Sequence, residues 1–141
     1  MSLFNVFDVA GSALNAQTIR LNTTASNLAN AESVNGDATK TYRARHPVFQ
    51  SMLESSDPFG ADQGAAAGVR VLGVVESTAP PLQRYAPENP LANKDGYVFT
   101  SNVNSIEEMT NMISANRSFA TNVEAINTAR DLLLKTISMG H

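Results

Sequence analysis

The C-terminal part of the chain is a long stretch, residues 105–139, that contains neither glycine nor proline. It opens with Ser105 and, three residues later, Glu108, a capping-box pattern that satisfies backbone N–H groups of a first helical turn. Lys135 lies near its end, the charge order that a helix dipole favours. These features predict one helix about 52 Å long. A compact domain of this chain length is about 37 Å across, so other molecules must cover part of the helix.

The predicted C-terminal helix carries a coiled-coil seam. Alternating steps of three and four residues connect mostly apolar positions: Met109, Met112, Asn116, Phe119, Val123, Ile126, Arg130, Leu133 and Ile137. A second line lies beside it: Ile106, Ile113, Ala120, Asn127 and Leu134. The remaining positions are mainly Asn, Ser, Thr and Ala, whereas a helix facing water usually carries many charges. We therefore expect neighbours around most of this helix.

A second helix with the same character is predicted over residues 3–29. Its apolar seam positions at the same spacing include Leu3, Phe7, Leu14, Leu21 and Leu28. Gly11 and several Asn residues lower its intrinsic helix propensity, so it needs packing partners. The obvious first partner is the C-terminal helix, in an antiparallel, coiled-coil-like pair.

The middle of the chain is less regular. Extended segments are predicted around residues 41–45 and 48–50, separated by His46 and Pro47, with further strands at 69–75, 82–85 and 97–100. Residues 55–68 are small, polar and rich in Gly and Ala, which predicts a flexible loop. The fold class expected is mainly α with a small β insert. The predicted organisation is an N-terminal helix (1–31), an irregular β/loop insert (32–103) and a C-terminal helix (104–141).

The composition excludes several classes of function. Aromatic residues make up 6% of the chain and Trp is absent, so a large globular core is not expected. The charged fraction of 16% is low and the net charge is −3, with no Lys/Arg cluster, which disfavours binding to nucleic acid. The absence of Cys excludes disulfides and a thiolate nucleophile. The N-terminus lacks the pattern of a cleaved signal peptide, so a secreted form would need another route.

Catalytic and metal-binding patterns are also missing. His46 and His141 lie at no useful spacing from other ligands, so no zinc site is expected. No phosphate-binding loop or nucleophile elbow occurs, and the turn at residues 93–96 lacks the ligand series of a calcium loop. We expect no enzyme activity, no cofactor and no small-molecule substrate.

Three other interpretations compete with a polymeric assembly. The seams alone are consistent with an intramolecular helix hairpin that has no further partners. A cytosolic coiled-coil adaptor or chaperone would have the same helices and form a closed oligomer. A small enzyme would need its active site in the insert. The scarcity of charge on the outer helix faces favours an assembly interface.

Specific residues then suggest a family. The run Ala25, Ser26, Asn27, Leu28, Ala29 and Asn30, followed by Tyr42 and Arg43 in a Thr-Tyr-Arg-Ala-Arg step, resembles the N-terminal segment of bacterial flagellar axial proteins. In the C-terminal helix, the blocks at residues 102–104, 107–109 and 112–119 are similar to that family in the same order. The short length and the Tyr-Arg-Ala step resemble the proximal-rod subunits of the flagellar basal body. The family's usual His-Pro is Asn89-Pro90 here, and Ser101 replaces an expected proline.

The resemblance implies a structural subunit of the flagellar rod, the driveshaft that crosses the periplasm, transmits torque and encloses the export channel. Such subunits polymerise helically through their terminal helices and are exported from the cytoplasm without a cleaved signal peptide by the type III export apparatus. Expected partners are copies of the same chain, the other rod proteins, the rod base at the membrane ring and a rod cap. Because the helices lack partners before assembly, we expect them to be largely disordered in the free subunit.

Overall fold

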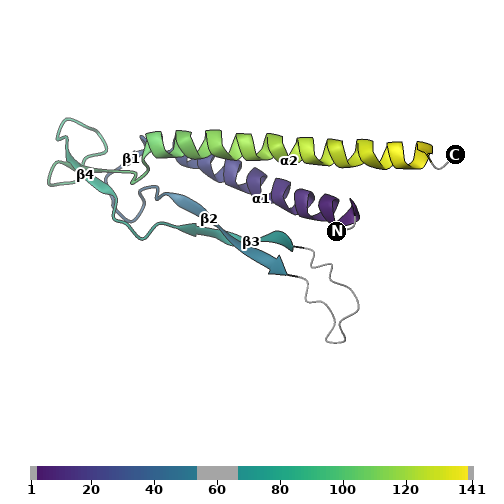
Figure 1. Cartoon of the computed structure of the whole chain (residues 1–141). Helices are drawn as coiled ribbons and strands as arrows, with labels where there is room; N and C mark the ends of the chain where they lie inside the picture. The colour runs from purple at the N-terminus through teal and green to yellow at the C-terminus, as the bar shows by residue number, and fades with distance from the viewer. Residues whose placement is uncertain (1–2, 54–66, 140–141) are drawn as a thin grey trace. The chain divides into compact units, whose positions relative to one another are not determined.

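The computed structural model describes residues 3–53 and 67–139, and it consists of two long helices and five short strands (Figure 1). Helix α1 spans Leu3–Ala29 and helix α2 spans Ser105–Met139, and the two run in opposite directions. The strands are β1 (Val34–Asn35), β2 (Arg45–Leu53), β3 (Ala67–Glu76), β4 (Leu82–Tyr85) and β5 (Tyr97–Thr100). The predicted fold class, a helix pair with a small antiparallel β insert, is confirmed. Most of the predicted loop at 55–68 lies outside the described residues.

The chain divides into two compact units. Unit 1 contains residues 1–19, 48–73 and 114–141, and unit 2 contains residues 20–47 and 74–113. Each unit therefore holds a part of both helices. The helices contact one another in both units: Val6 shares a groove with α2 residues in unit 1, and Arg20 bonds to Asn111 in unit 2.

Asparagine side chains cap the start of α2 and the end of α1. At the start of α2, Asn104 Oδ1 accepts from the N–H groups of Ile106 and Glu107 at 3.1 and 3.4 Å. The cap is thus Asn104 rather than the predicted Ser105, one residue earlier, because asparagine fills the N-cap position as well as serine does. At the end of α1, Asn30 Nδ2 donates to the carbonyl of Ser26 at 2.8 Å. This bond satisfies one carbonyl that the last helical turn leaves free.

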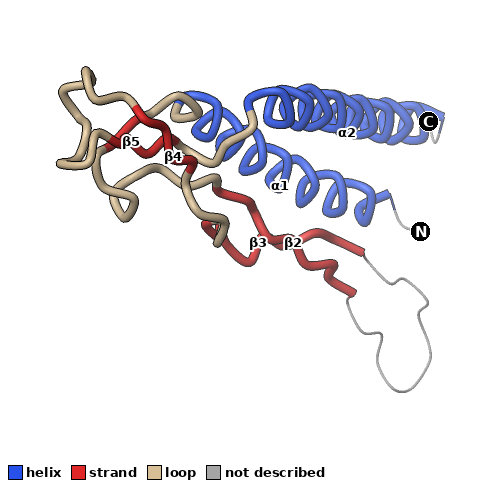
Figure 2. The backbone as a smooth tube through the Cα atoms, turned by 90° about the vertical axis from the view of Figure 1, so that its left-hand side faces the viewer, coloured by secondary structure: helices blue, strands red, loops and turns tan. Residues whose placement is uncertain are grey.

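Unit 2 contains a three-stranded antiparallel sheet in the order β1-β5-β4, of which β4 and β5 are labelled in Figure 2. Val98 in the central strand is fully buried, and Tyr85 pairs directly with Tyr97 across β4 and β5, with their rings edge to face at 5.2 Å. Gly96 precedes β5 with a φ of 79°, a backbone conformation that favours glycine. Gly36 follows β1 at a close approach, since a Cβ added there would lie 2.5 Å from the Leu91 carbonyl oxygen.

The second sheet contains only β2 and β3. The sequence predicted that His46 and Pro47 interrupt two extended segments, but β2 runs through both residues. A two-stranded ribbon leaves one edge of each strand without a neighbour. Proline is tolerated there because that edge needs no backbone donor. Ser12 Oγ of α1 accepts from the Val69 N–H at 3.1 Å, which ties the start of β3 to α1 within unit 1.

Candidate assembly surface

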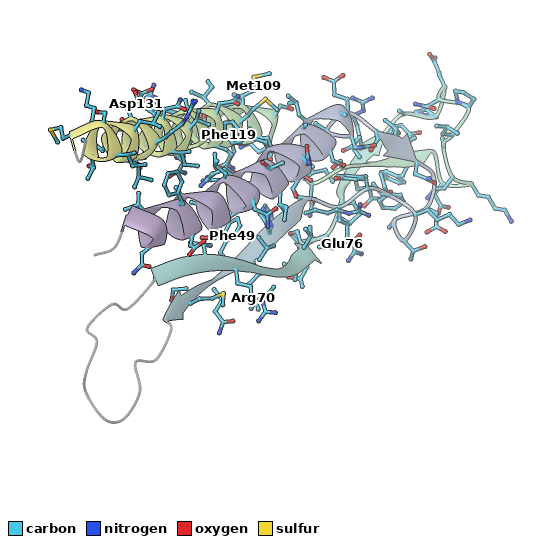
Figure 3. The ribbon with its side chains drawn as sticks, turned by 90° about the vertical axis from the view of Figure 1, so that its right-hand side faces the viewer. Phe49, Arg70, Glu76, Met109, Phe119 and Asp131 are labelled. Atoms are coloured by element: carbon cyan, nitrogen blue, oxygen red, sulfur yellow. The ribbon has the colours of Figure 1, made fainter. Side chains whose placement is uncertain are left out.

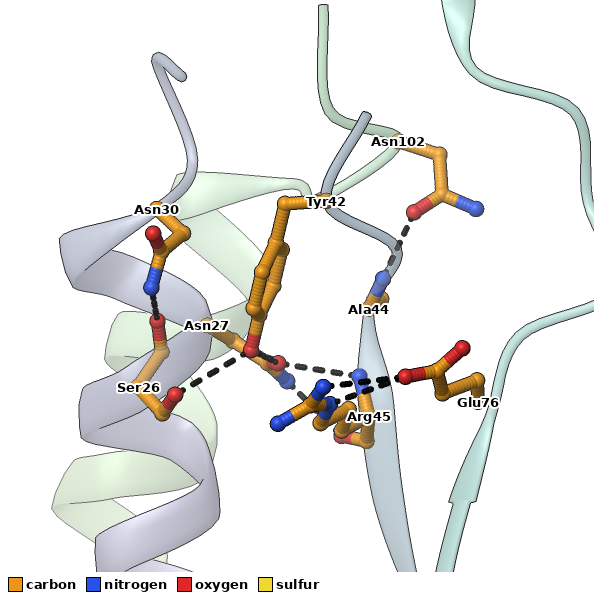
Figure 4. A network of polar contacts seen from close by, with 8 residues as sticks. All are labelled: Ser26, Asn27, Asn30, Tyr42, Ala44, Arg45, Glu76 and Asn102. Carbon is orange, nitrogen blue, oxygen red and sulfur yellow. Dashed lines mark hydrogen bonds and ion pairs between the residues drawn. The ribbon is translucent and has the colours of Figure 1, made fainter. Parts of the chain in front are cut away.

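The family-motif residues surround a buried amide at the end of α1 (Figure 4). Asn27 has no exposed surface, and its side chain forms three hydrogen bonds. Its Oδ1 accepts from the Arg45 N–H and from the Tyr42 hydroxyl, both at 2.9 Å, and its Nδ2 donates to the Arg45 carbonyl at 2.8 Å. The amide thus pairs with both polar groups of one residue, as a neighbouring strand would. It fixes the first residue of β2 to α1.

A second asparagine has a similar role in unit 2. Asn102 Oδ1 accepts from the Ala44 N–H at 2.8 Å, and its Nδ2 donates to the Ala79 carbonyl at 2.9 Å. Ala44 and Arg45 therefore have their backbone N–H groups satisfied by two asparagine side chains. Backbone donors without partners are costly, so both asparagines supply acceptors where the chain enters β2. Ser101 also donates its N–H to the Ser33 carbonyl, a bond that the proline typical of the family could not make.

The charged groups around this network are mostly exposed. Arg45 forms an ion pair with Glu76 at 3.0 Å and lies over the Tyr42 ring at 5.4 Å. The two charged side chains are 47% and 58% exposed, so their pairing contributes little to stability. Nearby, hydrogen bonds from the backbone N–H and the hydroxyl of Thr39 hold the pKa of Asp37 below its usual value. These charged side chains therefore belong to the exposed polar surface of unit 2.

The other motif residues divide between surface and interior. Ala25 and Ala29 are exposed, whereas Ser26 and Leu28 are half-buried. Asn30, Tyr42 and Arg43 line a polar hollow in unit 2. The residue types of this network could be read from the sequence as a family motif, but their hydrogen bonds could not.

The α2 residues of the predicted packing seam fall into two groups by their exposed fraction. Met112, Phe119, Ile126 and Leu133 are half-buried, while Met109, Val123 and Ile137 are 52%, 36% and 63% exposed. Met109 points away from α1 in Figure 3. The positions of α2 that are at least half-buried at the alternating spacing are Glu108, Met112, Ala115, Phe119, Asn122, Ile126, Ala129 and Leu133. Ala115 and Ala129, which the sequence pattern passed over, are the most buried apolar residues of α2.

On α1 the predicted seam residues Phe7, Leu14, Leu21 and Leu28 are all half-buried, and the side chain of Leu3 lies outside the described residues. The exposed line of α2 follows its own spacing of three and four: Ile106, Met109, Ile113, Asn116, Ala120, Val123, Asn127, Arg130, Leu134 and Ile137. This line combines the second predicted line with part of the first. A solvated helix face rarely carries so many large apolar side chains.

Hydroxyl groups add little polarity to this helix. The hydroxyls of Thr110, Thr121, Thr128 and Thr136 each donate to the carbonyl four residues earlier in α2. Because these donors are already satisfied within the helix, the side chains can be covered by a neighbour without leaving an unpaired group.

No group of three potential metal-ligating side chains occurs in residues 3–53 and 67–139. His46 is exposed, and His141 lies outside these ranges. Within the same ranges, neither helix has a segment of the length and hydropathy needed to cross a membrane.

Comparison with known proteins agrees with the resemblance seen in the sequence. The family model described as "Flagella basal body rod protein" matches residues 7–36. The model described as "Flagellar basal body rod FlgEFG protein C-terminal" matches residues 94–139. These two matches include residues 25–30 of the family motif and all of α2.

Relatives of the same length are similar from end to end. The flagellar basal-body rod protein FlgC of Escherichia coli O6:H1 is 50% identical over 141 residues, covering 99% of each chain. FlgC of Salmonella typhimurium is 48% identical over 140 residues, also with 99% of each chain. FlgC of Buchnera aphidicola from Schizaphis graminum is 41% identical over 140 residues at the same coverage. The chain therefore belongs to the flagellar basal-body rod protein family.

Proposed function

We propose that this chain is a structural subunit of the flagellar basal-body rod that polymerises helically through its terminal helices. The observation that carries the proposal is the exposed apolar line of α2 in a chain of this family. Ile106, Ile113 and Ile137 are 78%, 61% and 63% exposed. Large apolar side chains exposed along one helix face mark sites of protein–protein contact in soluble proteins. Copies of the same chain are the proposed neighbours.

The physical character of the helices suits a polymer that carries mechanical load. A head-to-tail contact that does not close a ring generates a helical filament. Each subunit would offer both long helices to neighbours, with the predicted seam residues in the packed interior of the tube. Torque would then be distributed over many contacts, each of modest strength. Catalysis has no place in this role, and we propose that the chain is not an enzyme.

The proposed environment follows from the same role. The rod would cross the periplasm and enclose the export channel, and the subunits would arrive through the type III apparatus without a cleaved signal peptide. The other rod proteins and the rod base at the membrane ring are the proposed neighbours at the ends of the polymer. A rod cap would assist its growth.

Complementation tests the proposal. The chain should restore swimming to Escherichia coli that lacks its own FlgC, since it is 50% identical to that protein over the full length. Leu28→Asp and Phe119→Asp should abolish the rescue, because each places a charge in a packed apolar position. The conservative controls Leu28→Met and Phe119→Leu should retain it. Normal swimming with either Asp variant would contradict the packing assignment.

A further inference from the structure

The end of α2 extends past the start of α1. Helix α1 begins at Leu3, and Val6, one turn into it, lies at a groove with the part of α2 between Ala120 and Leu132. Since the helices run in opposite directions, little of α1 remains to cover α2 beyond Leu132 (Figure 1). The last six described residues of α2 are all exposed, and Leu134, Ile137 and Met139 are 54%, 63% and 80% exposed. This end therefore presents large apolar side chains that α1 does not cover.

The groove itself is the second half of the observation. Its lining combines small side chains from α2 with three larger ones, and consists of Val6, Ala120, Thr121, Glu124, Ala125, Thr128, Ala129 and Leu132. Small residues let another helix approach closely. The hydroxyls of Thr121 and Thr128 are bonded to helix carbonyls, so they present mainly their methyl groups. A helix seated there would leave neither hydroxyl unpaired.

Charge indicates which helix fits. Glu124 is the only charged residue in the lining, is exposed, and forms no ion pair with another described residue. At the end of α2, Leu132, Lys135 and Met139 share one face by their spacing of three and four residues. That segment offers large apolar side chains and one cation, where the groove offers small apolar side chains and one anion.

We propose that residues 132–139 of α2 from one copy pack into the groove of a second copy, with Lys135 facing Glu124. The inference rests on the proposed rod function and specifies one of its subunit contacts. The groove and the helix end are successive stretches of one face of α2 that meet at Leu132. In a parallel contact, residues 132–139 of one copy lie beside residues 121–128 of the next, so each copy still offers its own groove to a further copy. Repeated contacts of this kind propagate into an open assembly rather than a closed dimer.

The absence of native cysteine makes the contact testable by disulfide crosslinking. One copy carries Ala125→Cys in the groove and the other carries Met139→Cys at the helix end, and both are co-expressed in the complemented Escherichia coli and oxidised in isolated basal bodies. The matched control replaces Ala125→Cys with Asn127→Cys, which lies at the same level of α2 on the opposite face. We expect a crosslinked dimer from the 125/139 pair and none from the 127/139 pair. A chain carrying both Ala125→Cys and Met139→Cys should give a ladder of multimers.

A charge reversal provides the second test. In the crosslinking background, Glu124→Lys should remove the 125/139 crosslink, and adding Lys135→Glu should restore it. Equal crosslinking at residues 125 and 127, or a dimer from Met139→Cys alone, would overturn the inference. If the variants support swimming and enter basal bodies without the 125/139 crosslink, this contact is wrong and the rod function stands. If the unmodified chain never enters basal bodies, the rod function itself is wrong.

Discussion

Replacing Asn27 with alanine removes the amide that fixes β2 to α1. Three hydrogen bonds are lost, to the N–H and carbonyl of Arg45 and to the Tyr42 hydroxyl. At a net contribution of about 1 kcal/mol for each bond, the loss is about 3 kcal/mol. The higher helix propensity of alanine offsets about 0.5 kcal/mol of it. We therefore expect unit 2 to lose about 2–3 kcal/mol of unfolding free energy.

The chain offers both a specific probe and a matched control. Its three tyrosines, Tyr42, Tyr85 and Tyr97, all lie in unit 2, and Trp is absent, so tyrosine fluorescence reports on this unit. With a urea m-value of about 1–3 kcal/mol/M, Asn27→Ala should lower the midpoint by about 0.7–3 M. Asn22→Ala is the control, because Asn22 is exposed on the same helix.

Asn27→Asp separates the contribution of the amide donor, Nδ2, from that of the acceptor oxygen, Oδ1. The carboxylate keeps the size of the amide but cannot donate to the Arg45 carbonyl, and it brings a buried charge against that oxygen. We expect it to destabilise unit 2 at least as much as Asn27→Ala at neutral pH. Equal urea midpoints for Asn27→Ala and Asn22→Ala would refute the reasoning, since the buried amide would then add nothing beyond an exposed one.

Two further predictions concern backbone space and an exposed carboxyl. Gly36→Ala should destabilise unit 2, because its Cβ would collide with the backbone carbonyl oxygen of Leu91. Gly11→Ala should stabilise α1 by about 0.5–1 kcal/mol, because a Cβ there would meet no atom within 4 Å. Urea unfolding followed by circular dichroism and tyrosine fluorescence distinguishes the two variants, and equal effects would contradict the geometry. Because the folded pKa of Asp37 is lowered, its contribution to stability is present above the unfolded value and is lost as pH falls through the folded one. Thr39→Ala removes the hydroxyl bond but keeps the backbone N–H bond, so it should raise that pKa only part of the way toward its usual value in an NMR titration. An unchanged titration would show that the Thr39 hydroxyl is not one of the causes.

The sequence predicted both helices over the residues that the structure assigns to them. The reason is physical: each is a long stretch without proline, and apolar residues recur at helical spacing. The bounds of β4 and β5 were also predicted, because Pro80, Pro81 and Gly96 mark the turns that precede them. Strand β2 was only partly predicted, since the tolerance of Pro47 depends on a free sheet edge.

The local contacts could not be predicted from pattern. Asn27 bonds to residues 15 and 18 positions away, and no periodicity encodes such a contact. Ala115 and Ala129 were passed over because the predicted seam runs through the next positions, Asn116 and Arg130, which the structure leaves exposed. Only the fold shows that these small residues face inward while Met109 and Ile137 remain exposed. The contacts between subunits remain predictions, whether argued from the sequence or from the structure of a single chain.

The free subunit provides a separate test of how the helices depend on neighbours. The sequence predicts that both termini are trimmed quickly by protease in dilute solution and that a core from about residue 42 to residue 100 survives. The Asn27 bonds and the Arg20–Asn111 bond extend the expected core to the helix segments of unit 2. Termini that resist cleavage while the middle is cut would instead indicate a closed helix bundle, as in the adaptor interpretation.

Mass spectrometry of basal bodies purified from the complemented Escherichia coli tests the rod assignment most directly. The account predicts that peptides of this chain co-purify with detergent-stripped basal bodies from swimming cells, and that they are absent from the same fraction when Phe119→Asp is expressed at an equal level. Swimming cells whose basal bodies lack the chain, with all of it in the soluble fraction, would contradict a structural role in the rod.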